Sequence, residues 1–156
     1  MSQAALLEYP IQIALGSVVA LYRKPARGVM EVADSLEAVG GKGFVGDYSF
    51  GKRRRQALLL STVELNAFGY RSGELRENIT LDIPGLQSLP IGTVITVGEV
   101  EFEIEQDCAP CGGMARRLGE DRQEFVAKMA GNRGMLCKVR SSGTIRVGDV
   151  VKVRGG

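Results

Sequence analysis

The sequence of 156 residues contains no histidine and no tryptophan. Without an imidazole group the chain cannot form a Ser-His-Asp triad or a Cys-His pair, because both need histidine as the general base. A structural zinc site is also disfavoured, since it needs a full set of cysteine or histidine ligands and the only thiols are Cys108, Cys111 and Cys137. These absences leave chemistry that depends on single thiols.

The cysteines are few and odd in number, and no secretory leader is expected before them. The stretch Ala4–Leu21 is apolar, but Glu8, Pro10 and Gln12 interrupt it and no basic residue opens it, so it is too broken for a signal peptide or a membrane span. We expect it to contain the first strand of the fold. Free thiols indicate a reducing compartment, so the sequence predicts a cytoplasmic protein with no membrane partner.

A surplus of charge of one sign is also lacking. Twenty basic side chains stand against 18 acidic ones, which leaves a net charge of +2. Proteins that bind nucleic acid usually carry a large positive surplus, so we expect no nucleic-acid partner. With 44% apolar and 24% charged residues the composition is globular, and the absence of a linker predicts a single domain over residues 1–156.

Glycine, by contrast, is abundant, with 21 residues spread between short apolar runs. This pattern is typical of β-rich proteins with many tight turns. It predicts a mainly β fold, a mostly antiparallel barrel of about eight to ten short strands with two or three short helices. The strands are expected at residues 13–22, 29–33, 35–39, 57–60, 79–81, 91–97, 100–105, 135–140, 144–147 and 147–153.

Two short helices are predicted from their capping residues. Ser61 and Glu64 have the spacing of a capping box, so a helix is expected near residues 62–70. Asp121 has the same relation to an acidic residue three positions later, and apolar residues at helical spacing follow it. The second helix is therefore expected near residues 121–130.

Two loops bear on ligand binding. Residues 40–47 form a glycine-rich loop that lacks the closing Gly-Lys-Ser/Thr of a P-loop, which excludes that kind of phosphate site. Residues 52–55, with the sequence Lys-Arg-Arg-Arg, are the one dense charge run of the chain. A solvated loop and an anion-binding role are both open for this run.

The segment from Asp107 to Met114 is the strongest candidate for function. It follows residues 100–105, where apolar and acidic residues alternate as in a strand with one buried face. A sheet thus delivers the chain to a turn that presents the thiol of Cys111 between a proline and two glycines. Arg116 and Arg117 follow closely, and nearby positive charge favours a thiolate. We therefore expect Cys111 to be the most reactive cysteine.

The other two thiols allow different interpretations. Cys108 and Cys111 have the Cys-x-x-Cys spacing of a redox dithiol, but the β-rich surroundings do not match a thioredoxin-like fold. Cys108 is either a small buried side chain or a thiol that resolves a modified Cys111 as a disulfide. Cys137 lies in the apolar run 135–137, so we expect it to be buried and the least reactive of the three.

Short motifs in a characteristic order extend along nearly the whole chain. They are Lys24-Pro25, Gly43 to Asp47, Arg76-Glu77-Asn78-Ile79, Leu89 to Gly92, Pro110-Cys111, Gly134 to Val139 and Gly143 to Asp149. Each motif is weak alone, but the ordered set resembles the MOSC domain. This module is found at the C-terminus of molybdenum cofactor sulfurases and as small standalone bacterial proteins.

The resemblance implies a MOSC-like β-barrel with a few short helices. It also implies a role in binding the molybdenum cofactor, molybdopterin, or in carrying sulfur. The sulfur carrier proposed for the family is the cysteine after proline, which falls on Cys111, so Cys111 would hold a persulfide and hand its sulfur to a metal centre. Cys111 is also the residue expected to contact that metal. Cys108 departs from the family pattern, and we expect it to act as a second catalytic thiol that resolves Cys111. The resemblance places cofactor-binding side chains at Lys24, Asp47, Arg76, Glu77, Asn78 and Arg116.

These assignments predict a single pocket. A phosphorylated pterin needs fixed positive charge, for which Lys24 and Arg76 are the candidates, and a hydrogen-bonding wall, for which Asn78 is the candidate. We therefore expect these three side chains and Cys111 to line one cleft, with part of residues 52–55 at its rim.

Two positions differ from many members of the family. An arginine commonly stands three residues before the cysteine, where this chain has Cys108, and a histidine soon after Gly-Asp, where it has Tyr48 and Ser49. The resemblance covers no pyridoxal-phosphate desulfurase domain, so we expect a partner to supply sulfane sulfur. The expected partner is a cysteine desulfurase, a molybdoenzyme or a reductase.

Three functions stay open at this point. The first is a module that binds the molybdenum cofactor or carries sulfur on Cys111. The second is an enzyme in its own right, either a thiol oxidoreductase that uses Cys108 and Cys111 or a molybdenum-dependent reductase. The third is a binding barrel without chemistry, whose thiols are structural.

Overall fold

The computed structural model describes residues 11–155, with side chains from residue 15 to residue 154. Residues 4–10 of the stretch expected to contain the first strand lie outside this range. The described residues form eleven strands: β1 Ile11–Arg23, β2 Glu31–Ala33, β3 Ser35–Val39, β4 Gly43–Phe44, β5 Ala57–Ser61, β6 Ile79–Asp82, β7 Val94–Val97, β8 Val100–Asp107, β9 Met135–Val139, β10 Gly143–Arg146 and β11 Val150–Gly155.

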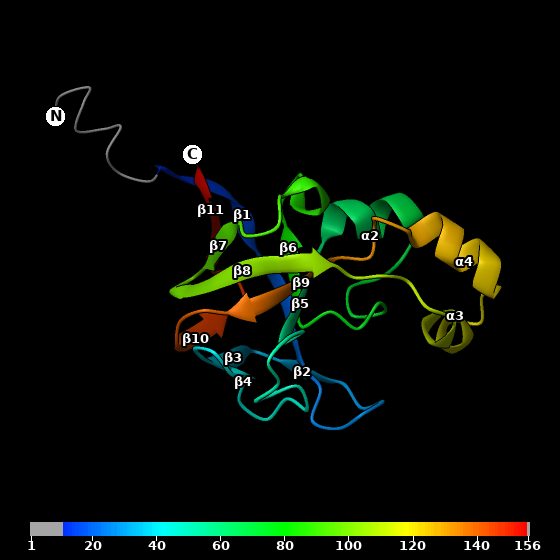
Figure 1. Cartoon of the computed structure of the whole chain (residues 1–156), viewed down its shortest axis with the longest axis horizontal. Coiled ribbons are helices and arrows are strands. Elements are labelled where there is room, and N and C mark those ends of the chain that lie inside the picture. The colour runs from blue at the N-terminus through cyan, green and yellow to red at the C-terminus, as the bar shows by residue number, and fades with distance from the viewer. Residues whose placement is uncertain (1–10, 156) are drawn as a thin grey trace, which may run out of the picture.

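The strands close into a barrel. The main sheet has the order β11-β7-β8-β9-β5-β6-β1-β2, and β11 also pairs with β1, so the sheet meets itself and only β2 stands outside the ring. A second, three-stranded sheet of β10, β3 and β4 lies beside one end of it (Figure 1). All pairings in the described chain are antiparallel except β5 with β6. The prediction of a mainly antiparallel β-barrel is therefore confirmed.

The alternation in the sequence sets the two faces of β8. Phe102 and Ile104 are buried in the barrel, while the alternating glutamates Glu101, Glu103 and Glu105 lie on the outer face and are half-buried. The ring of Phe102 packs against that of Phe44 with centroids 5.9 Å apart. All five residues of β5 are buried, because one face of this strand lines the barrel and the other is covered by helices. The outer face of β8 therefore accommodates charged side chains, whereas the polar residue of β5, Ser61, is buried and hydrogen-bonded to the Ile83 carbonyl and the Val63 N–H.

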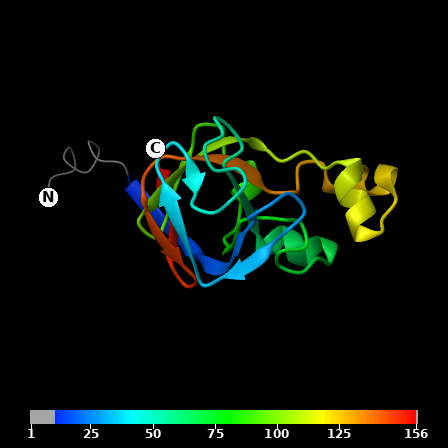
Figure 2. The same cartoon turned by 90° about the horizontal axis from the view of Figure 1, so that it is seen from below.

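Three short α-helices and one 3-10 turn complete the fold of residues 11–155. They are α2 Thr62–Phe68, the turn η1 Leu86–Ser88, α3 Gly112–Leu118 and α4 Arg122–Met129. The helices predicted near residues 62–70 and 121–130 correspond to α2 and α4. The pair α3–α4 lies at the end of the molecule opposite to the start of β1 and the end of β11 (Figures 1 and 2). A second apolar cluster, with Leu60, Leu65, Met114 and Phe125 among its members, joins these helices to β5.

The helix caps agree in part with the predicted capping boxes. The Ser61 side chain accepts a hydrogen bond from the backbone N–H of Val63, at 3.1 Å, and Asp121 accepts one from Glu124, at 3.1 Å. The return bond from Glu64 is not made, and its Oε2 has no partner within the described residues. One cap bond is enough to satisfy an N–H group that would otherwise be unpaired at the first turn.

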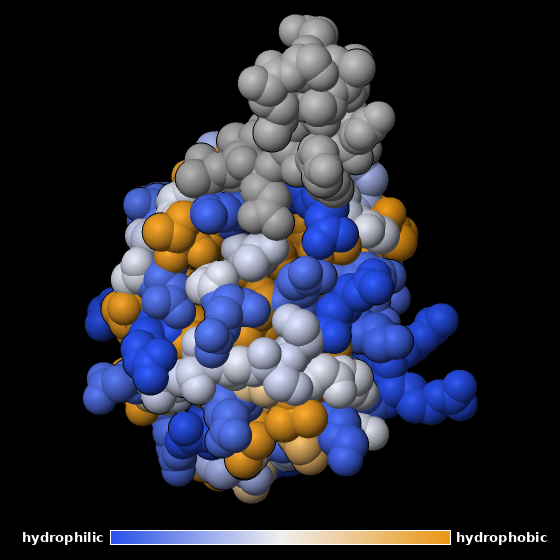
Figure 3. Space-filling model, turned by 90° about the vertical axis from the view of Figure 1, so that its left-hand side faces the viewer, coloured by the Kyte–Doolittle hydropathy of each residue, from blue (hydrophilic) through white to orange (hydrophobic). Residues whose placement is uncertain are grey.

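The outer surface carries no single large apolar face on the side where β1 begins and β11 ends. Polar and apolar residues are interspersed there in the part of the surface that is not covered by grey atoms (Figure 3). None of the helices in residues 11–155 combines the length and the apolar character needed to span a bilayer.

Candidate functional site

A small basic pocket lies where several distant segments of the chain converge. It is formed by residues after β1, in the loop between β4 and β5, before β6, after β8 and before β9, and its volume is about 150 Å³. No carboxylate is among its lining side chains. The residues that line this basic pocket are Lys24, Tyr48, Ser49, Lys52, Arg55, Leu58, Arg76, Asn78, Cys108, Arg133 and Leu136.

Lys24 is the most deeply placed lysine of the pocket. Its side chain is buried, with 8% exposed, and its Nζ donates a hydrogen bond to the backbone carbonyl of Arg76 at 3.0 Å. Burial lowers the pKa of Lys24 to about 8, an effect that Arg76 and Arg133 reinforce and Asp47 opposes. A buried ammonium that is held by a carbonyl rather than by a carboxylate keeps its charge available to an anionic ligand.

Asp47 lies behind the pocket wall and holds Asn78, which is part of the lining. The carboxylate of Asp47 accepts hydrogen bonds from the backbone N–H groups of Lys24, at 2.9 Å, and Ser49, at 3.1 Å, and from the Asn78 side chain, at 3.2 Å. The Asn78 amide also donates to the Tyr22 carbonyl and accepts from the backbone of β5. Asp47 is not a lining residue, and the amide hydrogens of Asn78 are already used within the protein. Both side chains therefore position the cationic groups.

Cys108 and Arg133 form the inner end of the pocket. Cys108 is buried, with 2% exposed, and its Sγ is contacted by Nη1 of Arg133, which is itself only 8% exposed. Nη2 of Arg133 donates to the Leu75 carbonyl at 3.4 Å, whereas Nε has no hydrogen-bond partner within the described residues. A buried guanidinium with an unpaired N–H is costly unless a ligand or solvent satisfies it.

The cationic side chains of the pocket lack acidic partners. The ion pairs among the described residues involve Arg23, Lys128, Arg140 and Arg154, and none involves Lys24, Arg76 or Arg133. Burial lowers the pKa of Arg76, and the charges of Arg117 and Arg133 add to that shift. Asp47, which lies outside the lining, offsets part of this charge, and the remaining positive charge in a confined space attracts anions.

An aromatic ring stands at the mouth of the pocket between two lysines. The centroid of the Tyr48 ring lies 4.7 Å from Nζ of Lys52 and 6.0 Å from Nζ of Lys24. Tyr48 is 39% exposed, and its backbone N–H donates to the Lys24 carbonyl at 2.7 Å. The ring thus offers a flat surface beside the cationic groups, on which a planar part of a ligand can stack.

Two arginines of the pocket have an unusual backbone. Arg55, with φ 59°, and Arg76, with φ 64°, are the residues other than glycine that have positive φ in the described chain. Residues other than glycine rarely adopt positive φ, and residues strained in this way are often found at ligand sites. Both lie in the wall of the same pocket.

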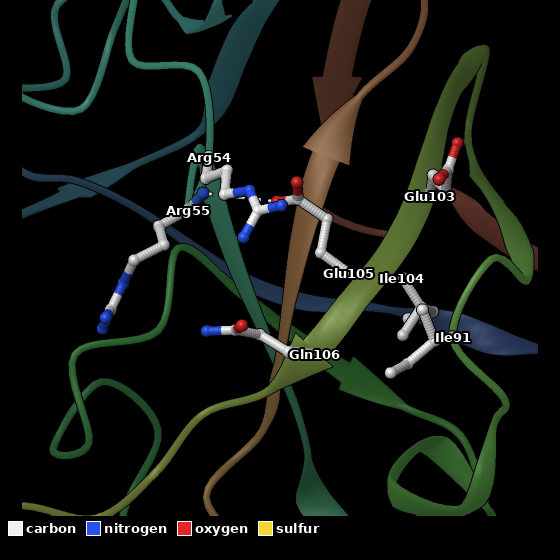
Figure 4. Close-up of a pocket in the computed structure, with 7 residues that line it drawn as sticks. All are labelled: Arg54, Arg55, Ile91, Glu103, Ile104, Glu105 and Gln106. Atoms are coloured by element: carbon white, nitrogen blue, oxygen red, sulfur yellow. Dashed lines mark hydrogen bonds between the residues drawn. The ribbon is translucent and has the colours of Figure 1, made fainter.

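A second depression lies directly beside the basic pocket and shares Arg55 with it. It is lined by Arg54, Arg55, Ile91, Glu103, Ile104, Glu105 and Gln106 (Figure 4). The backbone N–H of Arg55 donates to Glu105 at 3.2 Å, while its guanidinium extends away from this carboxylate. Because glutamates line this depression, its positive charge is partly balanced. The basic pocket, in contrast, has no carboxylate in its lining.

The expectation that Cys111 lines the same pocket as Lys24, Arg76 and Asn78 is wrong. Cys111 is exposed and lies at the N-terminus of α3, where it lines a separate groove of about 490 Å³ against α4. The chain leaves β8 at Asp107, so Cys108 still lies against the barrel while the next residues carry Cys111 out to the helices. We call this the Cys111 groove; its lining residues are Pro110, Cys111, Gly112, Arg122, Gln123, Val126 and Ala127.

The remaining predicted residues lie in different places. Glu77 is fully buried and accepts hydrogen bonds from Gly73, at 2.9 Å, and Thr80, at 2.8 Å, so it holds the turn before β6 and does not line the pocket. Arg116 is exposed on α3, outside both lined spaces. Cys137 is fully buried in the barrel, and burial raises the pKa of its thiol.

Sequence reasoning missed Arg133 and left open whether Cys108 is a buried side chain or a resolving thiol; the structure shows it buried. Arg133 is an isolated arginine in the turn between α4 and β9, and no motif or charge run marks it. The sequence does indicate that Cys108 lies at the barrel wall, because it immediately follows the strand β8. No group of three or more acidic, cysteine or histidine side chains is placed to hold a metal ion in the described part of the chain.

Comparison with known proteins identifies the family of this chain. The family model described as MOSC domain matches residues 50–152, more than half of the chain, a span that contains Arg76, Cys108, Cys111 and Arg133. Lys24 lies before it. None of the curated proteins matches the chain.

Solved structures share the architecture at low sequence identity. The YUAD protein from Bacillus subtilis has a TM-score of 0.80 and 23% identity over 95% of this chain and 100% of that one. YiiM from Escherichia coli has a TM-score of 0.67 and 15% identity over 92% and 71%, and YiiM from Geobacillus stearothermophilus has 0.60 and 15% over 92% and 75%. Because these identities are low, the solved structures show the barrel fold alone. Membership of a family is shown by the family model. The chain belongs to the MOSC domain family.

Proposed function

We propose that this protein binds an anionic, phosphorylated small molecule in the basic pocket, and that the molybdenum cofactor is that molecule. The observation that carries the proposal is the pair of buried cations, Lys24 and Arg133, which face one small cavity without a carboxylate partner. Membership of the MOSC family supports the choice of cofactor.

The residues present fit one end of such a cofactor. Lys24, Arg76 and Arg133 would hold a phosphate, because cationic donors bind phosphate oxygens with short, charge-assisted hydrogen bonds. The unpaired Nε of Arg133 supplies a further donor. Tyr48 at the mouth offers a surface for a flat ring.

The size of the pocket limits how much of the ligand it encloses. Sites that enclose a whole drug-sized ligand measure about 300–1,000 Å³. The basic pocket, at about 150 Å³, is smaller, so the phosphate end would be held inside and the rest of the cofactor would lie across the mouth. Arg55 and Lys52 are placed at that mouth by the loop before β5.

When bound, the cofactor would supply a metal centre able to accept sulfur or to take part in a reduction. The protein's own side chains supply binding and orientation. Lys24 and Arg133 neutralise charge, and Asp47 and Asn78 hold the backbone segments that carry the cationic groups. Ser49 adds a polar group to the wall.

The test is cofactor retention and anion affinity in matched variants. Wild-type protein and Arg133→Met would be purified from a molybdenum-replete host and compared by native mass spectrometry and metal analysis. Affinity for inorganic phosphate would be measured by titration calorimetry. Loss of a charged hydrogen-bonding partner is worth about 1.5–3 kcal/mol, so we expect phosphate affinity to fall by about 10- to 100-fold.

Arg122→Met is the control, because it removes an arginine from the Cys111 groove and leaves the basic pocket intact. We expect phosphate affinity and cofactor retention to be the same in this variant as in wild type. Equal phosphate affinity in wild type and Arg133→Met would contradict the proposal.

A second candidate function is sulfur carriage on Cys111, and its exposure is the specific observation that favours it. An exposed thiol on a protruding helix pair can meet the persulfide of a partner protein, such as a cysteine desulfurase. Loading wild type and Cys111→Ser with a desulfurase and mapping the persulfide by mass spectrometry tests this function. Equal loading of the two proteins would exclude Cys111.

A further inference from the structure

We propose that the basic pocket is also a sulfurtransferase site, in which Cys108 takes sulfane sulfur from a small sulfur oxyanion such as thiosulfate. This activity goes beyond the proposed function: it uses a different thiol from the Cys111 carrier and a dissolved anion in place of a partner protein. It shares with the cofactor proposal only the cationic lining of the pocket.

The first support is the placement of the thiol among cations. The Sγ of Cys108 is in contact with the Arg133 guanidinium, and Lys24 and Arg76 line the same small space. Thiolates that act as nucleophiles are found beside lysine and arginine side chains. Cys108 packs against Leu58 and Leu136 on one side and contacts a guanidinium on the other, whereas Cys137 belongs to the apolar core of the barrel.

The second support is the unsatisfied donor next to the thiol. Arg133 is more than nine-tenths buried, and its Nε has no hydrogen-bond partner in the described chain. The ammonium of Lys24 is also buried, has one carbonyl acceptor and makes no ion pair with a described carboxylate. Several donors and a sulfur nucleophile around one space match an anion that carries both oxygens and a transferable sulfur.

The third support is the size and depth of the site. A volume of about 150 Å³ admits a small tetrahedral anion completely. Cys108 is only 2% exposed, so the active-site loop of a partner protein does not reach its sulfur atom. The pocket therefore selects small anionic donors for Cys108 and leaves protein donors to the exposed Cys111.

The reaction is balanced without any further reagent. The Cys108 thiolate attacks the outer sulfur of thiosulfate, an S–S bond forms on Cys108, and the S–S bond of thiosulfate breaks with its electron pair leaving on sulfite. One thiolate and one dianion give one persulfide anion and one dianion. Arg133 and Lys24 would hold the oxyanion and stabilise the departing sulfite. Cyanide then removes the outer sulfur as thiocyanate and restores the thiolate.

The experiment uses the full chain after reduction and removal of bound small molecules. Wild type, Cys108→Ser, Cys111→Ser, Arg133→Met and Arg133→Lys would each be incubated with thiosulfate. Sulfite release, thiocyanate formed on addition of cyanide, and the mass of the cysteine peptides are the three readouts. We expect an added sulfur atom on Cys108 in wild type and in Cys111→Ser, and none in Cys108→Ser.

The arginine variants separate chemistry from folding. We expect Arg133→Met to raise the KM for thiosulfate and lower thiocyanate formation by about tenfold or more, and Arg133→Lys to restore part of that loss, since lysine keeps the charge but not the planar donors. Circular dichroism of each variant checks that the barrel is intact. A purely structural arginine would not give a graded rescue of KM.

The outcomes distinguish this inference from the cofactor proposal. Sulfur found on Cys111 instead of Cys108, or sulfite release no faster than in Cys108→Ser, overturns the sulfurtransferase site while phosphate affinity and cofactor retention stand. If Arg133→Met binds phosphate as tightly as wild type while thiosulfate still adds sulfur to Cys108, only the cofactor proposal is overturned.

Discussion

The two thiols of the Cys-x-x-Cys segment lie in contrasting surroundings. Cys108 is buried at the inner end of a small pocket whose charged side chains are all cationic. Cys111, three residues later, is exposed in a larger groove between α3 and α4, where Val126 and Ala127 form an apolar wall and Arg122 is the one charged lining residue. Close spacing in the sequence therefore does not make these two thiols one redox pair.

The difference teaches which donor each thiol can meet. A small pocket lined by cationic side chains and no carboxylate favours small anions, because the charge attracts them and the size excludes larger molecules. An exposed thiol on a helix pair at the far end of the molecule is open to another protein (Figures 1 and 2). The same short segment would thus serve two kinds of sulfur donor through two surfaces.

The largest expected difference between the regions is in the rate of thiol alkylation. Cys111 should react first with iodoacetamide, and Cys137 last, because its thiol is fully buried and burial raises its pKa. A thiol that reacts only after local opening is slowed by about 100-fold or more. Timed labelling with peptide mapping measures the order. Saturating sulfate should slow Cys108 and leave Cys111 unchanged; equal protection of both would abolish the contrast.

Backbone rigidity provides the next comparison. Gly134 has φ 99°, and a Cβ there would lie 2.5 Å from the backbone oxygen of Leu59, whereas a Cβ on Gly112 would meet only the flexible Arg122 side chain, at 3.0 Å. Gly134→Ala should lower the free energy of unfolding by about 2–4 kcal/mol through strain and overpacking. Gly112→Ala should change it by less than about 1 kcal/mol.

Urea denaturation of the two glycine variants measures both values. The carbonyl of Gly134 accepts the backbone N–H of Cys108 at 2.9 Å, so Gly134→Ala should also weaken sulfate binding. Comparable destabilisation by both substitutions would show that the pocket side is no more rigid than the helix pair.

The buried charge of Lys24 should make the pocket a weak point of the fold. Lys24→Met removes an ammonium that has no carboxylate partner, so we expect it to raise the free energy of unfolding at pH 7 by about 1–2 kcal/mol while anion binding falls. In wild type the charged amine disfavours folding below pH 8, and this cost disappears as pH rises from about 8 toward the ordinary value of 10.5.

The stabilising effect of Lys24→Met should therefore be largest below pH 8 and shrink at higher pH. Urea titrations at several pH values measure it. Lys52→Met is the matched control, since Lys52 is exposed at the mouth and its removal should change stability by less than about 0.5 kcal/mol. If the free energies of unfolding of wild type and Lys24→Met differed by the same amount from pH 6 to 10, the lowered pKa of Lys24 would be contradicted.

The smallest effect is the pH dependence of anion binding. Sulfate keeps its charge across this range, so its affinity reports the pocket alone. As pH rises through about 8, Lys24 loses its proton. The affinity for sulfate should then fall by a few-fold, because one of several cationic hydrogen-bond donors loses its charge. Lys24→Arg should bind sulfate with a flatter profile. Calorimetric titration of both proteins checks this expectation.

The sequence by itself determined much of the fold. The alternation in residues 100–105 placed Phe102 and Ile104 inside the barrel, Ser61 and Asp121 marked the starts of two helices, and the ordered motifs identified the family. These features are local, because strand faces and helix caps follow from residues a few positions apart. Lys24, Arg76 and Asn78 were also predicted to meet, and all three line the basic pocket.

Only the tertiary structure decided which thiol joins them. Closure of the barrel brings the turn before β9, with Arg133, against the end of β8 and the segment after β1, although these lie far apart in the chain. The path of the chain after Asp107 then leaves Cys108 inside and carries Cys111 out to the helices. Burial of Lys24, which lowers its pKa, comes from the same convergence of distant segments. Such contacts depend on packing between residues that have no periodic relation in the sequence, so no local pattern encodes them.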